Sequence, residues 1–228
     1  LHGAGAGGRW LGFQLKLAER FDVIAPVHPG HAGAPPAEWI EHISDLAFHY
    51  LDLMDTLELP RVHLVGASLG GWIAAEMATF ASHRLASMVL IDPVGIKVDG
   101  WIYPFLFGMD LMEMVGMIFR NPVAAMALAP SDMSLDTIVD LYRQSTAIAR
   151  VSWNPYLYDP LLRRRLARSP GLTIVGEATS GTQAIELLGH LEQAPDAALV
   201  DVEMPVMDGF VTTRQLRGLA PGLKVVLI

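Results

Sequence analysis

Residues 65–71, Val-Gly-Ala-Ser-Leu-Gly-Gly, place a serine between two glycines where a predicted strand meets a predicted helix. Such a sharp turn lifts the serine hydroxyl above the edge of a sheet, and the glycines avoid collision with neighbouring backbone. The amides at the start of the helix point toward the same place, where negative charge develops during acyl transfer. Ser68 is therefore the candidate nucleophile.

Short β-rich runs alternate with helical patterns around this turn. The sequence predicts strands at 21–25, 61–65 and 87–91 and helices at about 37–57 and 69–81. This order predicts an α/β fold, a doubly wound parallel sheet with helices on both faces. No β-run appears from residue 96 to about 167, where we expect a helical insertion.

The composition excludes several classes of protein. The chain has 228 residues, of which 52% are hydrophobic and 18% charged, so it is a globular protein with a large core. A formal charge of −8 gives no basic surface for nucleic acid. The absence of cysteine excludes disulfides, thiolate zinc sites and a thiol nucleophile, and agrees with a cytoplasmic protein. The longest apolar stretch, Trp101 to Phe119, contains a proline and two acids, so we expect no membrane span.

Residues 1 to about 167 resemble an α/β-hydrolase that carries a helical lid and uses no cofactor. The resemblance rests on residues 1–5 (Leu-His-Gly-Ala-Gly), the loop 25–33, the serine turn and residues 89–95 (Val-Leu-Ile-Asp-Pro-Val-Gly). It implies Ser68 as nucleophile and the backbone N–H groups of Ala4 (or Gly5) and Leu69 as the oxyanion hole. The implied divisions are a core at 1–95 that holds the nucleophile elbow and a lid at 96–167.

The family also uses an acid and a histidine that this sequence does not supply at the corresponding positions. The turn at 176–181 carries no aspartate, and no histidine follows the next strand. His190 is expected at a helix end, and His28 and His31 are expected to be structural. Asp92 ends a strand but has no histidine to orient. Because a serine hydroxyl needs a histidine to accept its proton, we expect impaired catalysis.

Residues from about 169 to 228 resemble a truncated receiver domain of bacterial response regulators. The resemblance rests on residues 172–181, 196–201 (Asp-Ala-Ala-Leu-Val-Asp) and 203–209 (Glu-Met-Pro-Val-Met-Asp-Gly). It implies Asp201 as phosphoacceptor, with the backbone carbonyl of Glu203 helping to bind Mg²⁺, and a histidine kinase as partner. The acids of the family's first strand are missing, so Mg²⁺ is expected to bind weakly at Asp201.

These two resemblances together predict a chimera. We expect the flavodoxin-like receiver strands of the partial receiver domain, residues 168–228, to complete the hydrolase sheet, and we expect both chain ends to be trimmed. Three functions stay open. They are a serine hydrolase of small apolar esters or carbonyl compounds, a phosphorelay module based on Asp201, and an inactive scaffold.

Overall fold

The computed structural model describes most of the chain. The described residues are 1–4, 7–8, 10–97, 104–118, 134–153, 155–171, 173, 175–176, 178, 180–200, 207 and 209–227.

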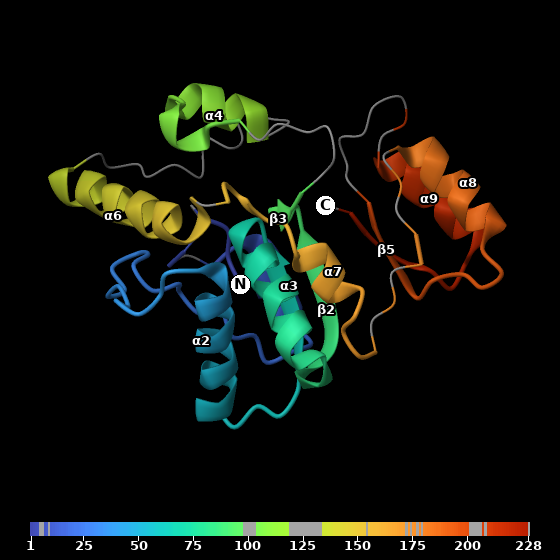
Figure 1. Ribbon diagram of the computed structural model, residues 1–228, viewed down its shortest axis with the longest axis horizontal. Helices are drawn as coiled ribbons and strands as arrows, with labels where there is room; N and C mark the ends of the chain where they lie inside the picture. Colours follow the sequence, from blue (N-terminus) through green and yellow to red (C-terminus); the bar gives the residue numbers. More distant parts are fainter. Residues whose placement is uncertain are drawn as a thin grey trace.

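Helices and strands alternate along the chain, as the sequence predicts (Figure 1). The elements are α1 (Gly12–Leu17), α2 (Ile43–Thr56), β1 (Val62–Ala67), α3 (Leu69–Ala81), η1 (Ser82–Arg84), β2 (Leu85–Ile91), β3 (Gly95–Ile96), η2 (Leu106–Gly108), α4 (Leu111–Ile118), α6 (Leu135–Ser152), β4 (Tyr158–Asp159), α7 (Leu162–Leu166), α8 (Gly181–His190), β5 (Ala197–Val200), α9 (Gly209–Leu219) and β6 (Lys224–Leu227).

The central layer is the parallel pair β1 and β2, with Ala67 opposite Ile91 at its C-terminal end. The first residues run beside β1, because the Ala67 N–H donates to the Leu1 carbonyl oxygen at 3.1 Å and the Leu1 amino group donates to the Val65 carbonyl oxygen. The strand expected at residues 21–25 is not formed. These residues are described, but they join no ladder and are mostly exposed.

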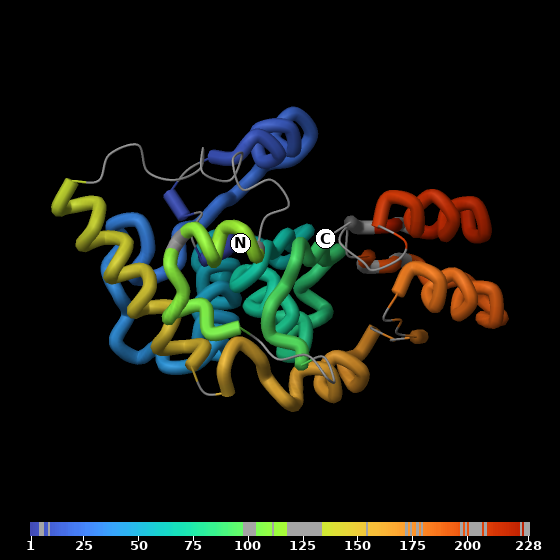
Figure 2. The backbone as a smooth tube through the Cα atoms, turned by 90° about the horizontal axis from the view of Figure 1, so that it is seen from above, coloured from blue at the N-terminus to red at the C-terminus, as the bar shows by residue number. Residues whose placement is uncertain are grey.

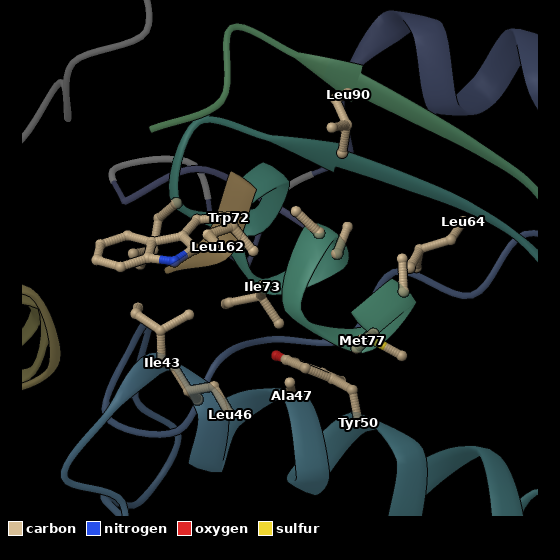
Figure 3. Packing of buried hydrophobic residues seen from close by; sticks show 14 of the residues in the cluster. Ile43, Leu46, Ala47, Tyr50, Leu64, Trp72, Ile73, Met77, Leu90 and Leu162 are labelled. Atoms are coloured by element: carbon tan, nitrogen blue, oxygen red, sulfur yellow. The ribbon is translucent and has the colours of Figure 1, made fainter. Parts of the chain in front are cut away.

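Helix α3 is the centre of the main hydrophobic core (Figure 3). Eleven of its residues are buried on all sides of the helix, which is typical of a helix enclosed by other elements rather than lying on a surface. Helix α2 packs on one side of α3 through Ile43, Leu46, Ala47 and Tyr50, while β1, β2 and α7 contact other sides. Among the described helices, the turn at Ser68 is therefore attached to the one with the most buried residues.

The expected insertion contains helices α4 and α6. Residues 98–103 and 119–133 of this insertion lie outside the described residues. Helix α6 lies against the loop that follows residue 28, because the Gly33 N–H donates to Asp140 Oδ1 at 3.2 Å and Arg150 Nη2 donates to the Glu38 carbonyl oxygen at 2.6 Å. The structure adds one short strand pair that the sequence did not predict, β3 with β4.

The C-terminal segment forms its own small layer of two helices, α8 and α9, against the parallel pair β5 and β6 (Figures 1 and 2). Its buried residues, Val200, Leu216, Ala220 and Leu223, form a second cluster that is separate from the main core. The described strands make three two-stranded sheets, so they do not form the single continuous sheet that the sequence analysis expected. Strand β6 approaches β2 without pairing with it.

No helix among the described residues has both the length and the apolar character needed to cross a membrane.

Candidate active site

Ser68 occupies a strained turn between β1 and α3. Its φ of 49° and ψ of −115° lie in a region that side chains other than glycine rarely adopt. The Ser68 N–H donates to the Ile91 carbonyl oxygen at 2.8 Å, and the Ser68 carbonyl oxygen accepts from the N–H groups of Gly71 and Trp72 at 2.9 and 3.1 Å. These bonds to β2 and to the first turn of α3 hold the strained conformation in place.

The glycines around Ser68 are required because backbone approaches each of them. A Cβ on Gly66 would overlap the Gly70 carbonyl oxygen. A Cβ on Gly70 would lie 2.5 Å from the Leu1 carbonyl oxygen, and one on Gly71 would lie 2.7 Å from Pro93 Cβ. The sequence analysis expected glycine at these positions because a side chain would collide with neighbouring backbone. The structure shows this collision at both Gly66 and Gly70.

The segment that ends in Ala4 passes directly beside the serine. A Cβ built on Gly3 would lie 3.2 Å from Ser68 Cβ and 3.9 Å from Ser68 Oγ. Leu69 is the first residue of α3, so its N–H has no acceptor within the helix. The structure thus brings the Gly3–Ala4 backbone, the Ser68 side chain and the N-terminus of α3 to one place. Gly5 lies outside the described residues.

No histidine nitrogen is hydrogen-bonded to the Ser68 hydroxyl in the described part of the chain. His63 contacts Ser87 Oγ at 2.8 Å, and His190 ends α8 in the separate C-terminal layer. Asp92 is exposed just after β2 with a φ of 45°. The described side chains therefore place no base within hydrogen-bonding reach of the serine.

Three histidines instead form a buried cluster next to the first loop. The ring centroids of His2 and His28 lie 3.7 Å apart, and those of His28 and His31 lie 5.4 Å apart. His28 is fully buried and His31 nearly so, which agrees with the structural role expected for both residues. Burial lowers the pKa of His2 to about 4 and lowers those of His28 and His31. Sequence patterns did not reveal that His2 and Tyr50 belong to this cluster, because its members are far apart in the chain.

A second buried polar cluster joins α3 to α7. Arg165 Nη2 lies 2.7 Å from both carboxylate oxygens of Glu76 and also pairs with Asp159, while Trp72 Nε1 donates to Glu76 Oε1 at 3.2 Å. Burial raises the pKa of Glu76 to about 7, against the opposing effect of Arg165. The partners of Arg165 thus lie on α3 and β4.

The phosphoacceptor and metal candidates, Asp201 and Glu203, lie outside the described residues. Strand β5 ends one residue before Asp201, and α9 begins at Gly209. Among the residues that the structure does describe, no group of three His, Asp or Glu side chains is arranged to hold a metal ion.

Comparison with known protein families gives a match over nearly the whole chain. The profile described as the alpha/beta hydrolase family matches residues 1–220. The chain belongs to this family. The match therefore also includes residues 168–220, which lie beyond the hydrolase resemblance predicted for residues 1 to about 167.

Curated relatives of this alpha/beta hydrolase include two components of acetoin cleaving systems. The dihydrolipoyllysine-residue acetyltransferase component of Cupriavidus necator is 33% identical over 216 residues, which are 89% of this chain and 56% of the relative. The corresponding component of Pseudomonas putida is 28% identical over 88% of this chain and 55% of its own length. The chain thus spans about half the length of these relatives. A protein-glutamate methylesterase/protein-glutamine glutaminase of Methanospirillum hungatei is 39% identical over 61 residues, 27% of this chain and 17% of its own length.

Solved structures share the fold of this alpha/beta hydrolase. A deformylase of Pseudomonas putida S16 superposes with a TM-score of 0.56 at 16% identity, covering 99% of this chain and 81% of the deformylase. A carboxylesterase of the thaumarchaeon Nitrososphaera gives a TM-score of 0.50 at 14% identity, covering 100% of this chain and 79% of the other. At these identities the likeness concerns the fold alone.

Proposed function

We propose that this alpha/beta hydrolase is a serine hydrolase of small apolar esters or carbonyl compounds, with Ser68 as nucleophile and the N–H groups of Ala4 and Leu69 as oxyanion donors. The observation that carries the proposal is the Ser68 turn, with its φ of 49° between glycines that admit no side chain and with Gly3 against the serine. A strained turn of this kind is typical of functional sites. The absence of cysteine supports a cytoplasmic location as part of the same proposal.

The chemistry follows from where charge develops. Ser68 Oγ attacks the acyl carbon, its proton leaves to a base or to water, and the carbonyl oxygen becomes an oxyanion. The two N–H groups and the N-terminus of α3 stabilise that oxyanion. Collapse expels the alcohol, which takes up a proton, and leaves an acyl-serine ester. Water then hydrolyses this ester to the acid and the free serine.

An aromatic cluster supports the choice of apolar substrates. The rings of Phe105 and Phe107 each lie 5.7–6.0 Å from those of Trp153 and Tyr156, centroid to centroid, and the last two lie 6.3 Å apart. Leu157, the next residue, accepts a hydrogen bond at 3.0 Å from the N–H of Gly95, in the segment that follows β2. This hydrogen bond connects the segment that carries the aromatic cluster to the C-terminal end of β2, beside Ser68.

We also propose that turnover is close to background. The described residues give Ser68 no histidine partner, and the loss of the base removes much of the rate of a serine hydrolase. An inactive scaffold is the alternative, in which Ser68 does not react at all.

Labelling with a fluorophosphonate tests the proposal. Ser68 Oγ displaces fluoride from phosphorus, and its proton leaves with the fluoride as hydrogen fluoride. We expect one adduct, mapped to Ser68 by mass spectrometry and lost in Ser68→Ala. An unlabelled wild-type chain, or an adduct at another residue, would refute the nucleophile. A burst of ester hydrolysis that disappears in Ser68→Ala would refute the expected impairment.

A second candidate function is phosphotransfer at Asp201, with Mg²⁺ bound weakly there and a histidine kinase as donor. The layer of α8, α9, β5 and β6 supports it, because Asp201 follows the C-terminal end of a parallel strand, where doubly wound sheets hold their ligands. Acetyl phosphate with Mg²⁺ should label the wild-type chain and the exposed control Asp196→Asn, but not Asp201→Asn. Equal labelling of all three, or of none, would remove this candidate.

A further inference from the structure

A chain of hydrogen bonds connects α2 to the backbone beside Ser68. The chain begins at the Tyr50 hydroxyl, which contacts His28 Nδ1. His28 Nε2 lies 2.8 Å from the His2 carbonyl oxygen, and the His28 N–H donates to His2 Nε2 at 3.0 Å. His2 Nδ1 lies 2.7 Å from the Gly3 carbonyl oxygen. Tyr50 and His28 are both buried, so water does not compete for the contact between them, while His2 is half-buried.

The partners fix the position of each proton. A carbonyl oxygen only accepts, so His28 Nε2 and His2 Nδ1 must carry the ring hydrogens. His2 Nε2 accepts from a backbone N–H and is therefore bare. His28 Nδ1 is then the bare nitrogen of a neutral ring and accepts from the Tyr50 hydroxyl. Every polar atom in the series has the partner that its protonation state requires.

The surroundings favour these neutral forms. Burial lowers the pKa of His28 well below its ordinary value and raises that of Tyr50. Positive charge on the neighbouring His2 or His31 would act on His28 in the same direction as burial. Near neutral pH, Tyr50 is therefore a hydroxyl donor and His28 a neutral acceptor.

The two ends of the series differ in how firmly they are held. Tyr50 lies on α2, and its ring projects into the packing between α2 and α3 (Figure 3). Gly3 is a loop residue, and a Cβ on it would lie 3.2 Å from Ser68 Cβ. Ala4, the proposed oxyanion donor, is the next residue. The series therefore connects a rigid core helix to a loop whose small displacements matter for catalysis, because a shift of about 1 Å at a reacting centre can cost about a hundredfold in rate.

We propose that Tyr50 and His28 are positioning residues that hold the Gly3–Ala4 backbone against Ser68 through His2, an inference that rests on the proposed function of Ala4. Neither residue touches substrate in this role. The competing interpretation is that the series only satisfies buried polar atoms and that the loop keeps its position without it.

Histidine ring ¹⁵N NMR of the wild-type chain tests the proton positions without any substitution. We expect His2 as the Nδ1–H tautomer and His28 as the Nε2–H tautomer at pH 7. The opposite tautomer at either residue, or a protonated ring, would overturn the inference.

Tyr50→Phe removes the first donor and keeps the ring, with Tyr142→Phe on the exposed part of α6 as the matched control. We expect amide hydrogen exchange at His28, whose N–H donates to His2 Nε2, and at Ala67, whose N–H donates to the Leu1 carbonyl oxygen, to become at least about tenfold faster in Tyr50→Phe. Exchange in α3 and in the control variant should stay as in wild type. Fluorophosphonate labelling of Ser68 should slow by about tenfold in Tyr50→Phe. Unchanged exchange at His28 and Ala67 would overturn the positioning role.

The two readouts separate this inference from the proposed function. A wild-type chain that does not react with the fluorophosphonate refutes Ser68 as the nucleophile. The tautomers and the amide exchange then still test whether the hydrogen bonds from Tyr50 through His28 and His2 hold the Gly3–Ala4 backbone. If Tyr50→Phe does not fold, the opposite tautomer at His2 or His28 in the wild-type chain would still overturn the inference, and the labelling rate of His28→Gln relative to wild type replaces that of Tyr50→Phe.

Discussion

Arg165 Nη2 lies 2.7 Å from each carboxylate oxygen of Glu76, although 89 positions separate the two residues. The pair connects α3 to α7, and Asp159 of β4 shares the same guanidinium group. Glu76 is only 2% exposed. Removal of the arginine therefore leaves a carboxylate in the core without its cation.

Arg165→Ala should destabilise the fold by about 2–3 kcal/mol, because the buried Glu76 carboxyl loses both hydrogen bonds from the guanidinium group and is left either unpaired or protonated. Arg164→Ala, on an exposed position of the same helix, should change the free energy of unfolding by no more than about 0.5 kcal/mol. Urea denaturation measures both. Equal effects of the two substitutions would show that the pair does not stabilise α7 against α3.

Glu76→Gln should change how stability depends on pH. The pKa of Glu76 is about 7 in the fold, above its ordinary value of 4.5, because burial favours the protonated carboxyl against the attraction of Arg165. A raised pKa contributes stability that is fully present below pH 4.5 and is lost as pH rises through 7. The free energy of unfolding of Glu76→Gln, relative to that of wild type, should therefore increase between pH 5 and pH 8. Denaturation midpoints that stay a constant distance apart across this range, as expected for the exposed control Glu186→Gln, would contradict the shift.

Gly70→Ala should cost at least about 2 kcal/mol, because the new methyl group would meet the Leu1 and His2 carbonyl oxygens at 2.5 and 2.6 Å. Gly189→Ala is the matched control in α8, where nothing lies within 4 Å of a new Cβ. It should stabilise the chain by about 0.5–1 kcal/mol through helix propensity. Thermal unfolding of both variants checks the opposite signs, and a tolerated Gly70→Ala would mean that residues 1–2 do not lie against the turn.

Ser68→Gly should raise the free energy of unfolding by about 1 kcal/mol, because glycine adopts the φ of 49° without strain. Ser68→Ala keeps the strain and should stay within about 0.5 kcal/mol of wild type. Both variants should lose fluorophosphonate labelling. If Ser68→Gly is no more stable than Ser68→Ala, the turn stores no strain energy.

Trypsin should cleave first at Arg168 and release residues 169–228. The segment after Arg168 leads to a layer with its own sheet and its own hydrophobic cluster. A hydrogen bond of 2.7 Å from Ser82 Oγ to the Pro170 carbonyl oxygen ties this segment to the end of α3. Early appearance of the fragment in gels and mass spectra is the expected result. Simultaneous cleavage throughout the chain would indicate one cooperative unit.

Local signals in the sequence were sufficient for the central elements. The glycines of residues 66–71 and the apolar runs beside them placed β1, α3 and β2 to within about two residues, a usual error at helix and strand ends. Helix α2 begins later than its apolar period suggests. Asp45 accepts hydrogen bonds from the N–H groups of Glu41 and His42, and this contact fixes the start of the helix at Ile43.

Features that depend on distant partners were not predictable. Residues 21–25 have the composition of a strand but find no strand to pair with. Tyr50 follows the helical period as a core residue, yet its hydroxyl also serves the histidines of a loop 22 positions away. The role of Arg165 depends on Glu76 in the same way. Periodicity reports which face is buried, but it does not report which polar atoms meet across the fold.

The burial of α3 has a consequence for where harmful variants would arise. The strained backbone of Ser68 is bonded to the first turn of a helix that is buried on all sides. Selection on the serine therefore extends to residues about two to three turns away, such as Ala75 and Ala78. In a library of variants screened for labelling of Ser68, the positions at which substitutions reduce labelling would follow the axis of α3 rather than surround the Ser68 hydroxyl.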